Sequence, residues 1–172
     1  MTDSSKTIFN CTYSKYPYSS HILFTDSANN DLDFLFISLL LLADEQESMV
    51  DRYLEKGTMY VLEDNNVKAE CVVTDEGNGI LEIKNIAVDS KHHGMGYGKA
   101  LIDFLVSKYA DEYSVLQVGT GDSPLTIPFY EKCGFVRSHK IPDFFTNNYE
   151  HPIYEGGVQL IDMIYLQRHI QL

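Results

Sequence analysis

The segment His92–Ala100 (HHGMGYGKA) carries glycines at positions 94, 96 and 98, between a stretch with strand character and a stretch with helix character. A helix begins with backbone N–H groups that have no partner inside the helix, and its dipole places a partial positive charge at the same end. Glycines lack a Cβ atom and therefore let a phosphate approach these donors closely. The segment predicts a diphosphate site that does not depend on basic side chains.

Two other glycine-loop chemistries fit this segment less well. A Walker A loop requires a glycine where His93 stands and a Ser or Thr where Ala100 stands. A dinucleotide-binding loop requires a glycine three residues after Gly96, where Lys99 stands, and an acidic ribose-binding residue further on, for which there is no clear candidate. The spacing therefore argues against loops of the ATP and NAD types.

The loop resembles the acetyl-CoA loop of the GNAT superfamily of N-acetyltransferases. That pattern is Gln or Arg, two residues, Gly, one residue, and then Gly or Ala, and here it runs from His93 to Gly98. The preceding LEIKNIAV, the apolar helix after the loop and the later GTGDSPLTIPFYEKCGF are also similar to the family. The resemblance covers roughly residues 58 to 140 and is strongest over 81 to 135.

The resemblance implies that a strand end and the loop together hold acetyl-CoA. In the family, the strand before the loop parts from its neighbour, and its free backbone binds the pantetheine arm and the thioester. The cofactor-binding residues implied here are Ile86, Ala87, Val88, His93, Gly94, Met95, Gly96, Tyr97, Gly98, Lys99 and Ser123. His93 replaces the usual Arg or Gln, and Ser123 stands where many relatives carry Asn. These two departures predict weaker CoA binding than is usual in the family.

The resemblance also implies catalytic residues. Tyr130 matches the tyrosine that in many relatives protonates the thiolate of CoA, and a phenol with a pKa near ~10 keeps its proton at neutral pH. The alternative is a tyrosine on a helix face whose hydroxyl bonds to the backbone. Glu82 is the first choice for the general base, although a solvated strand carboxylate paired with a cation explains it equally well. Asp122 and His151 are further candidates for the base.

Metal and disulfide chemistry are not indicated. His92 and His93 are adjacent and lack the i, i+4 spacing of a helical zinc pair, and no cluster of Asp or Cys accompanies them. The 3 cysteines, Cys11, Cys71 and Cys133, match neither a zinc site nor a disulfide framework. We therefore expect no metal and a reducing, cytoplasmic location.

The elements that must position these residues follow from the apolar pattern. The sequence predicts strands near His21–Thr25 and at Thr58–Glu63, Val67–Thr74, Ile80–Val88, Tyr113–Val118, Phe135–Ile141 and Gly157–Tyr165. It predicts helices at Leu32–Ala43, Glu45–Lys56, Gly96–Asp111 and Pro124–Lys132. The expected fold is α/β (α+β), with a mixed, mostly antiparallel sheet of about six or seven strands covered by helices on both faces, as in GNAT proteins.

We expect a single domain over residues 1–172, with a loosely ordered start over 1–20 and an acceptor-side loop over 142–157. That loop is rich in aromatic and acidic residues, which could hold a cationic amine through cation–π and ion-pair contacts. The same aromatic side chains could instead pack the open end of the sheet or form a homodimer contact. The residues are Asp143, Phe144, Phe145, Tyr149, Glu150, Tyr154 and Glu155.

Composition narrows the partners. With 25 acidic and 13 basic residues the net charge is -12, which argues against nucleic-acid binding and favours a cationic acceptor. The longest apolar run, Phe34–Ala43, falls short of the ~20 residues that span a bilayer. The N-terminal MTDSSKTIFN lacks the pattern of a secretory signal, so we expect no membrane partner.

The hypothesis from sequence is an N-acetyltransferase in which a primary amine, on a small molecule or a peptide, directly attacks bound acetyl-CoA in a ternary complex. A CoA-binding sensor or interaction module that keeps the loop without turnover is the alternative from another functional class. A nucleotide-binding protein is a third and less well supported reading.

Overall fold

A computed structural model of the chain describes residues 7–11 and 30–170. Its main sheet has seven strands in the order β1-β2-β3-β4-β5-β9-β6, and a separate pair is formed by β7 and β8. β4 and β5 pair in parallel, whereas β1–β2, β2–β3, β5–β9 and β6–β9 pair antiparallel. This confirms the predicted mixed, mostly antiparallel α/β fold.

The chain divides into two compact parts, which are described here one at a time. The first part contains residues up to 75 and residues 84–105, and the second contains residues 76–83 and residues from 106 onward. β3, β4 and α3 each contribute residues to both parts. Single-domain organisation stays a prediction.

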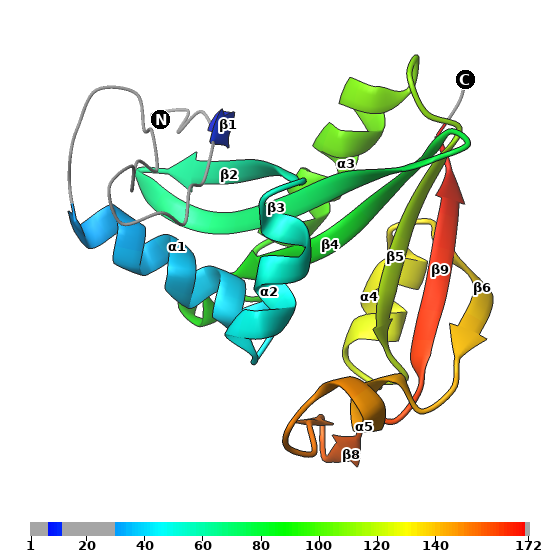
Figure 1. The fold of residues 1–172 in the computed structure, drawn as a ribbon. Coiled ribbons are helices and arrows are strands. Elements are labelled where there is room, and N and C mark those ends of the chain that lie inside the picture. The colour runs from blue at the N-terminus through cyan, green and yellow to red at the C-terminus, as the bar shows by residue number, and fades with distance from the viewer. Residues whose placement is uncertain (1–6, 12–29, 171–172) are drawn as a thin grey trace. The chain divides into compact units, whose positions relative to one another are not determined.

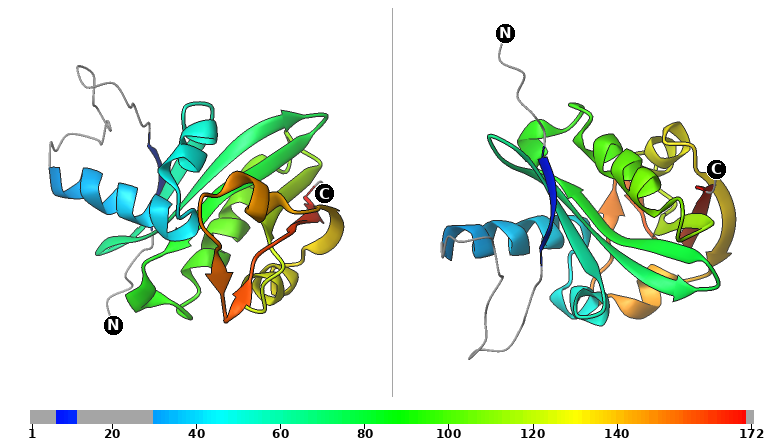
Figure 2. Two further views of the ribbon diagram at one scale, coloured as in Figure 1. Left: turned by 60° about the horizontal axis from the view of Figure 1, so that its bottom comes forward. Right: turned by 90° about the horizontal axis from the view of Figure 1, so that it is seen from above.

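In the first part, helices cover both faces of the sheet. The elements are β1 (Thr7–Cys11), α1 (Asn30–Ala43), α2 (Glu47–Leu54), β2 (Thr58–Asp64), β3 (Asn66–Gly77), β4 (Ile80–Val88), the 3-10 turn η1 (Ser90–His92) and α3 (Tyr97–Tyr109). Buried side chains of α1 and α2, such as Leu40 and Val50, form one apolar cluster with Val61 of β2 and Val72 of β3. α3 lies on the opposite face of these strands (Figure 2). There the ring of Tyr60 in β2 contacts that of Phe104 in α3, with 5.1 Å between the centroids.

The two predicted strands Thr58–Glu63 and Val67–Thr74 are confirmed as β2 and β3, which form an antiparallel hairpin. Asp64 and Asn66 face each other across Asn65, whose φ of 64° closes the turn. The register shifts between Leu62 and Glu63, so one extra residue of β3 is accommodated next to the turn. β4 occupies the predicted range, Ile80–Val88.

In the second part, β9 lies between β5 and β6 (Figure 1). The elements are β5 (Val115–Gly121), α4 (Thr126–Lys132), β6 (Val136–Ile141), α5 (Phe144–Asn148), β7 (Tyr154–Glu155), β8 (Val158–Gln159) and β9 (Met163–His169). Gly134 follows the C-cap of α4, and its φ of 86° suits a residue without Cβ. The predicted strand–helix–strand order is confirmed here.

The prediction of one strand over Gly157–Tyr165 is wrong. β8 ends at Gln159 and β9 begins at Met163. Between them the N–H of Leu160 donates to the carbonyl of Ile153 and the carbonyl of Ile161 accepts the N–H of Phe145, each at 2.9 Å, so this backbone bonds to residues outside the main sheet. Asp162, just before β9, accepts the backbone N–H of Asp143 at 2.9 Å and the ammonium of Lys140 at 2.5 Å. The segment expected to be a loop, 142–157, contains α5 and β7.

The start of the described chain also differs from expectation. β1 pairs with β2 along Thr7–Cys11, inside the segment for which no strand was predicted. The strand expected near His21–Thr25 lies outside the described residues. Among the helices that the structure describes, none combines the length and the apolar character needed to cross a bilayer.

Candidate functional site

The glycine loop between β4 and α3 is held open by two glycines in left-handed conformation. Gly94 has a φ of 77° and Gly96 a φ of 86°. A Cβ atom built at either position would meet no other atom within 4 Å. The backbone here therefore borders free space, and the φ values favour glycine for conformational reasons.

Four N–H groups in the loop and the first turn of α3 have no partner among the described residues. The N–H of Ala100 makes the first bond of the helix, to the carbonyl of Gly96 at 3.0 Å, whereas those of Gly94, Gly96, Gly98 and Lys99 donate to no described acceptor. Together with the open space over Gly94 and Gly96, these donors fit a diphosphate group at a helix N-terminus.

The strand end before the loop extends beyond its neighbour's ladder. β4 pairs with β5 over Ile80–Ile83 and Val115–Val118, but β4 itself continues to Val88. Of the residues predicted to bind the cofactor arm, Ile86 and Val88 are half-buried and Ala87 is buried. On its β5 side, the backbone of β4 beyond Ile83 is thus outside the ladder, while β3 is the neighbouring strand on its other side.

His93 is exposed, but its ring contacts the backbone of β4. Its Nε2 lies 2.9 Å from the carbonyl oxygen of Val88, and because a carbonyl only accepts, the proton of the ring sits on Nε2. The side chain therefore folds back onto the strand end that precedes the loop. A sequence pattern that places His93 in the loop gives no sign of this contact.

The remaining predicted loop residues differ in exposure. Tyr97 is buried, and its hydroxyl donates to Asp64 at 2.8 Å, which raises the pKa of Tyr97 above its ordinary value. Lys99 forms an exposed i, i+4 pair with Asp103, and Met95 is 57% exposed. The loop thus has an anchored end at Tyr97 and an exposed centre.

Glu82 lies in the second part and is only 5% exposed. Its Oε2 accepts the amide N–H of Gln117 at 2.8 Å, and Gln167 donates in turn to the amide oxygen of Gln117 at 2.6 Å. The alternative of a solvated carboxylate is therefore wrong, while the role of Glu82 as a base stays a prediction. Gln117 and Gln167 were not singled out from the sequence.

Tyr130 is buried in α4. Its ring contacts those of Phe129 and Phe135, with centroids at 5.1 and 5.6 Å. Ser123, before this helix, is also buried, and its hydroxyl oxygen accepts the N–H of Leu125 at 3.0 Å. The structure gives Ser123 a local role at the entry to α4, and its contact with a cofactor stays a prediction.

Comparison with known proteins identifies the family. The sequence model of the acetyltransferase (GNAT) domain matches residues 55–137. An N-acetyltransferase of Bacillus subtilis (strain 168), YvbK, described as uncharacterized, is 34% identical over 131 residues, which cover 74% of this chain and 84% of YvbK. This chain belongs to the GNAT acetyltransferase family. Members of the family use acetyl-CoA.

Two solved GNAT structures extend the likeness over nearly the whole chain. A GNAT family acetyltransferase from Elizabethkingia anophelis with acetyl-CoA bound has a TM-score of 0.78 and 31% identity, with 98% of this chain and 99% of that chain covered. The Bacillus subtilis acetyltransferase in complex with CoA has a TM-score of 0.76 and 28% identity, with coverage of 96% and 99%.

The other candidate bases of this GNAT chain are less favourably placed. Asp122 is exposed and pairs with the guanidinium of Arg137 at 3.2 Å, and His151 is exposed before β7. In the predicted acceptor-side loop, Phe145 is buried and stacks on Tyr149 with 5.5 Å between the ring centroids, so these two rings pack against each other.

Within the described residues, no cluster of His, Cys, Asp and Glu could hold a metal ion.

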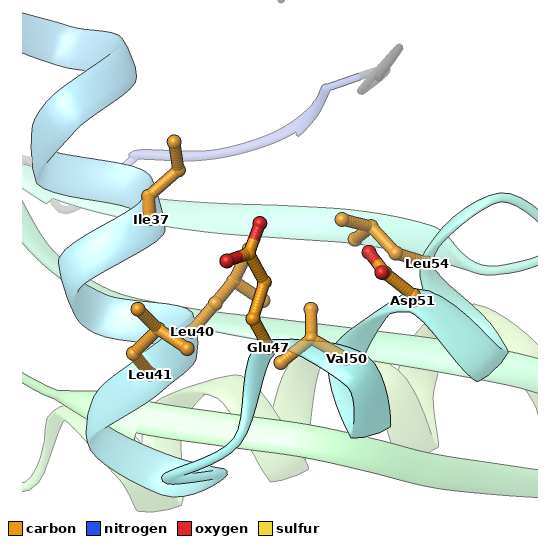
Figure 3. Close-up of a pocket in the computed structure, with 7 residues that line it drawn as sticks. All are labelled: Ile37, Leu40, Leu41, Glu47, Val50, Asp51 and Leu54. Carbon is orange, nitrogen blue, oxygen red and sulfur yellow. The ribbon is translucent and has the colours of Figure 1, made fainter.

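A small pocket lies between α1 and α2 in the first part (Figure 3). Its volume is about 30 Å³, far below the ~300–1,000 Å³ of ligand pockets. Apolar side chains line it together with the carboxylates of Glu47 and Asp51, and none of the predicted site residues is among them. We assign it no part in the chemistry of this GNAT protein.

Proposed function

We propose that this GNAT chain is an N-acetyltransferase that binds acetyl-CoA and transfers its acetyl group to a primary amine by direct attack in a ternary complex. The observation that carries the proposal is the set of unpartnered N–H groups at Gly94, Gly96, Gly98 and Lys99, beside free space at the two left-handed glycines. Solved relatives bind acetyl-CoA or CoA, which supports the same ligand here.

The residues divide the work of binding. The loop donors hold the diphosphate without a fixed cation, since backbone N–H groups at a helix start favour negative charge. The backbone of Ile86–Val88, beyond the β4–β5 ladder, is the candidate for orienting the pantetheine arm. Acetyl-CoA supplies an acetyl group activated as a thioester.

The two proton transfers fall to Glu82 and Tyr130. Glu82 takes a proton from the attacking amine, because an ammonium has no lone pair with which to form the new C–N bond. The N–H of Gln117 on Oε2 orients this carboxylate. Tyr130 gives a proton to the sulfur that leaves as the C–S bond breaks, and free thiol is the second product.

The first test uses two glycines with the same backbone conformation. Gly94 and Gly77 both have a φ of 77°, and a Cβ at either would meet nothing within 4 Å. Gly94→Ala and Gly77→Ala should therefore lose similar stability, about 1 kcal/mol, from the left-handed φ. Only Gly94→Ala should weaken CoA binding, measured by calorimetry and by the shift in Tm. Equal CoA affinity in the two variants would refute the loop assignment.

The second test separates catalysis from binding. Wild-type protein should release thiol from acetyl-CoA with members of an amine panel, and Tyr130→Phe should lower kcat at least tenfold while CoA affinity changes little. Phe129→Leu is the control, because Phe129 packs against the same ring and carries no proton. A Tyr130→Phe enzyme as fast as wild type would remove Tyr130 from the mechanism.

A CoA-binding module without turnover is the second candidate. The burial of Tyr130 between two aromatic rings favours it, since a tyrosine in a purely packing role has the same surroundings. CoA binding by wild type without thiol release from any amine, together with indifference to Tyr130→Phe, would select this candidate.

A further inference from the structure

Lys68 is a buried lysine with an unusual set of partners. Its side chain in β3 is 8% exposed, and its ammonium contacts the amide oxygen of Asn66 and, at 3.2 Å, Nε2 of His92. No carboxylate of the described chain pairs with it. Because an ammonium only donates, Nε2 of His92 must accept, and the proton of this ring lies on Nδ1.

The same imidazole continues to a carboxylate. Nδ1 of His92 lies 3.2 Å from Oδ2 of Asp89, while Oδ1 of Asp89 accepts the N–H of Lys91 at 3.0 Å. The bond from Lys91 and, to a smaller extent, His92 hold the pKa of Asp89 below its ordinary value. The backbone N–H of Asp89 donates to the carbonyl of Lys68 at 2.8 Å. We name this chain of contacts the Lys68–His92–Asp89 bridge.

The bridge attaches His92, at the start of the glycine loop, to β3. The carbonyl of His92 accepts the N–H of Met95 at 3.3 Å, and the ring of His92 meets the edge of Tyr97 with centroids 6.1 Å apart. Tyr97 is held in turn by Asp64. The exposed stretch that carries Gly94 and Gly96 is thus restrained at both ends by side chains that are outside it.

We propose that the Lys68–His92–Asp89 bridge positions the glycine loop for the CoA diphosphate, and that a proton added to His92 Nε2 opens the bridge and weakens CoA binding. The proposal rests on the proposed function, in which this loop binds CoA. Lys68, His92 and Asp89 are positioning residues, since they act through the loop backbone.

The charges that face His92 determine which contact breaks. Lys68 faces Nε2 from β3, Asp89 faces Nδ1, and Lys91 belongs to the same turn. Tyr97 faces the ring from α3, and its hydroxyl connects to Asp64 of β2. A second proton places an imidazolium 3.2 Å from the ammonium of Lys68 while it strengthens the contact with Asp89. The Lys68–His92 contact is therefore the one that opens.

The test compares the CoA affinity of wild type, His92→Gln and His93→Gln between about pH 5.5 and pH 8, the range in which imidazoles titrate. Glutamine offers Lys68 an acceptor that does not titrate. CoA affinity of wild type should fall roughly tenfold more on acidification than that of His92→Gln. The ionisation of the CoA phosphates is common to all variants and cancels. His93→Gln should keep the wild-type dependence.

Two outcomes overturn the proposal: the same pH dependence in His92→Gln as in wild type, or its loss in His93→Gln alone. A second readout needs no CoA. In the free protein, nitrogen NMR of the His92 ring should show the proton on Nδ1 near pH 8, and Lys68→Met should alter that state. A proton on Nε2 in wild type refutes the bridge, whereas a correct tautomer with no CoA binding at any pH refutes the proposed function instead.

Discussion

Glu70 is the residue whose environment departs furthest from that of an ordinary carboxylate. It is fully buried in β3, and neither of its oxygens has a hydrogen-bond partner in the described chain. Burial raises its pKa from 4.5 to about 8, although the backbone of Ala87 acts in the opposite direction. The folded protein therefore holds a neutral Glu70 at pH 7.

This shift predicts a pH-dependent stability. Between about pH 4.5 and pH 8 the folded state keeps a proton on Glu70 that the unfolded state releases, so the free energy of unfolding falls as pH rises through this window. The full shift corresponds to a cost on the order of 5 kcal/mol above the window. Glu70→Gln should remove this slope and be the more stable protein at pH 9, as measured by urea unfolding at several pH values.

Glu76→Gln is the matched control, because Glu76 belongs to the same strand but is exposed. It should retain the wild-type slope. If wild type and Glu70→Gln unfold with the same pH dependence, Glu70 is ionised in the folded protein and its burial is relieved by solvent.

For single residues, the sequence predicted where the loop glycines lie but not which side chains hydrogen-bond to one another. The glycines at 94 and 96 were recognisable, because a left-handed conformation and close approach to a ligand both demand that residue. The contacts between Lys68 and His92 and between Glu82 and Gln117 join residues 24 and 35 positions apart. The pair of Glu82 and Gln117 depends on strand register, and that of Lys68 and His92 on where the turn after β4 lies against β3, neither of which the alternation of apolar residues determines.

Three neighbouring strands contribute the polar row Glu82–Gln117–Gln167, one residue each from β4, β5 and β9. Glu82 faces Gln117 in the parallel ladder, and Gln117 faces Gln167 in the antiparallel one. The bond from Gln167 fixes the amide of Gln117 so that its N–H groups point to Glu82. The row depends on both ladders keeping their register.

Gln117→Leu should leave the buried carboxylate of Glu82 without this donor. We expect a loss of about 1–3 kcal/mol in the free energy of unfolding at neutral pH, together with slower acetyl transfer. Gln159→Leu in β8 is the control, since Gln159 makes no side-chain hydrogen bond in the described part of the chain. Equal stability of the two variants in urea titrations would show that Glu82 does not depend on the row.

The elements themselves were largely predictable where one signal dominated. The predicted bounds of β4 match the observed ones, because β4 is a clear run of strand residues with a glycine-containing turn before it. The break between β8 and β9 was not predicted because Leu160 and Ile161 continue an apolar run, whereas in the structure their backbone bonds to Ile153 and Phe145, outside the main sheet. Hydrogen bonds of this kind leave no periodic pattern in the sequence from which the break could be predicted.

Over the whole molecule, the net charge of -12 should have opposite effects on the two substrates of the proposed reaction. CoA carries negative phosphates and an amine acceptor is a cation before it loses its proton, so the average field repels the first and attracts the second. In the function proposed above, the backbone donors of the loop offset this repulsion locally, and their contribution does not depend on mobile ions.

Salt should therefore change kcat/KM for acetyl-CoA and kcat/KM for the amine in opposite directions. Raising ionic strength from about 0.01 M to 0.15 M shortens the Debye length from ~30 to ~8 Å and screens the field of the protein. The kcat/KM for acetyl-CoA should rise, because repulsion weakens, and that for a diamine should fall. Both are measured as initial rates of thiol release with the other substrate saturating.

Acetyl-pantetheine, which carries the thioester without phosphates, is the control donor, and its kcat/KM should be insensitive to salt. A fall in kcat/KM for acetyl-CoA on adding salt would mean that cations near the loop, such as Lys91 and Lys99, outweigh the net charge at the site. The sign of the salt effect thus distinguishes a loop that binds through its backbone against an unfavourable field from one that relies on exposed lysines.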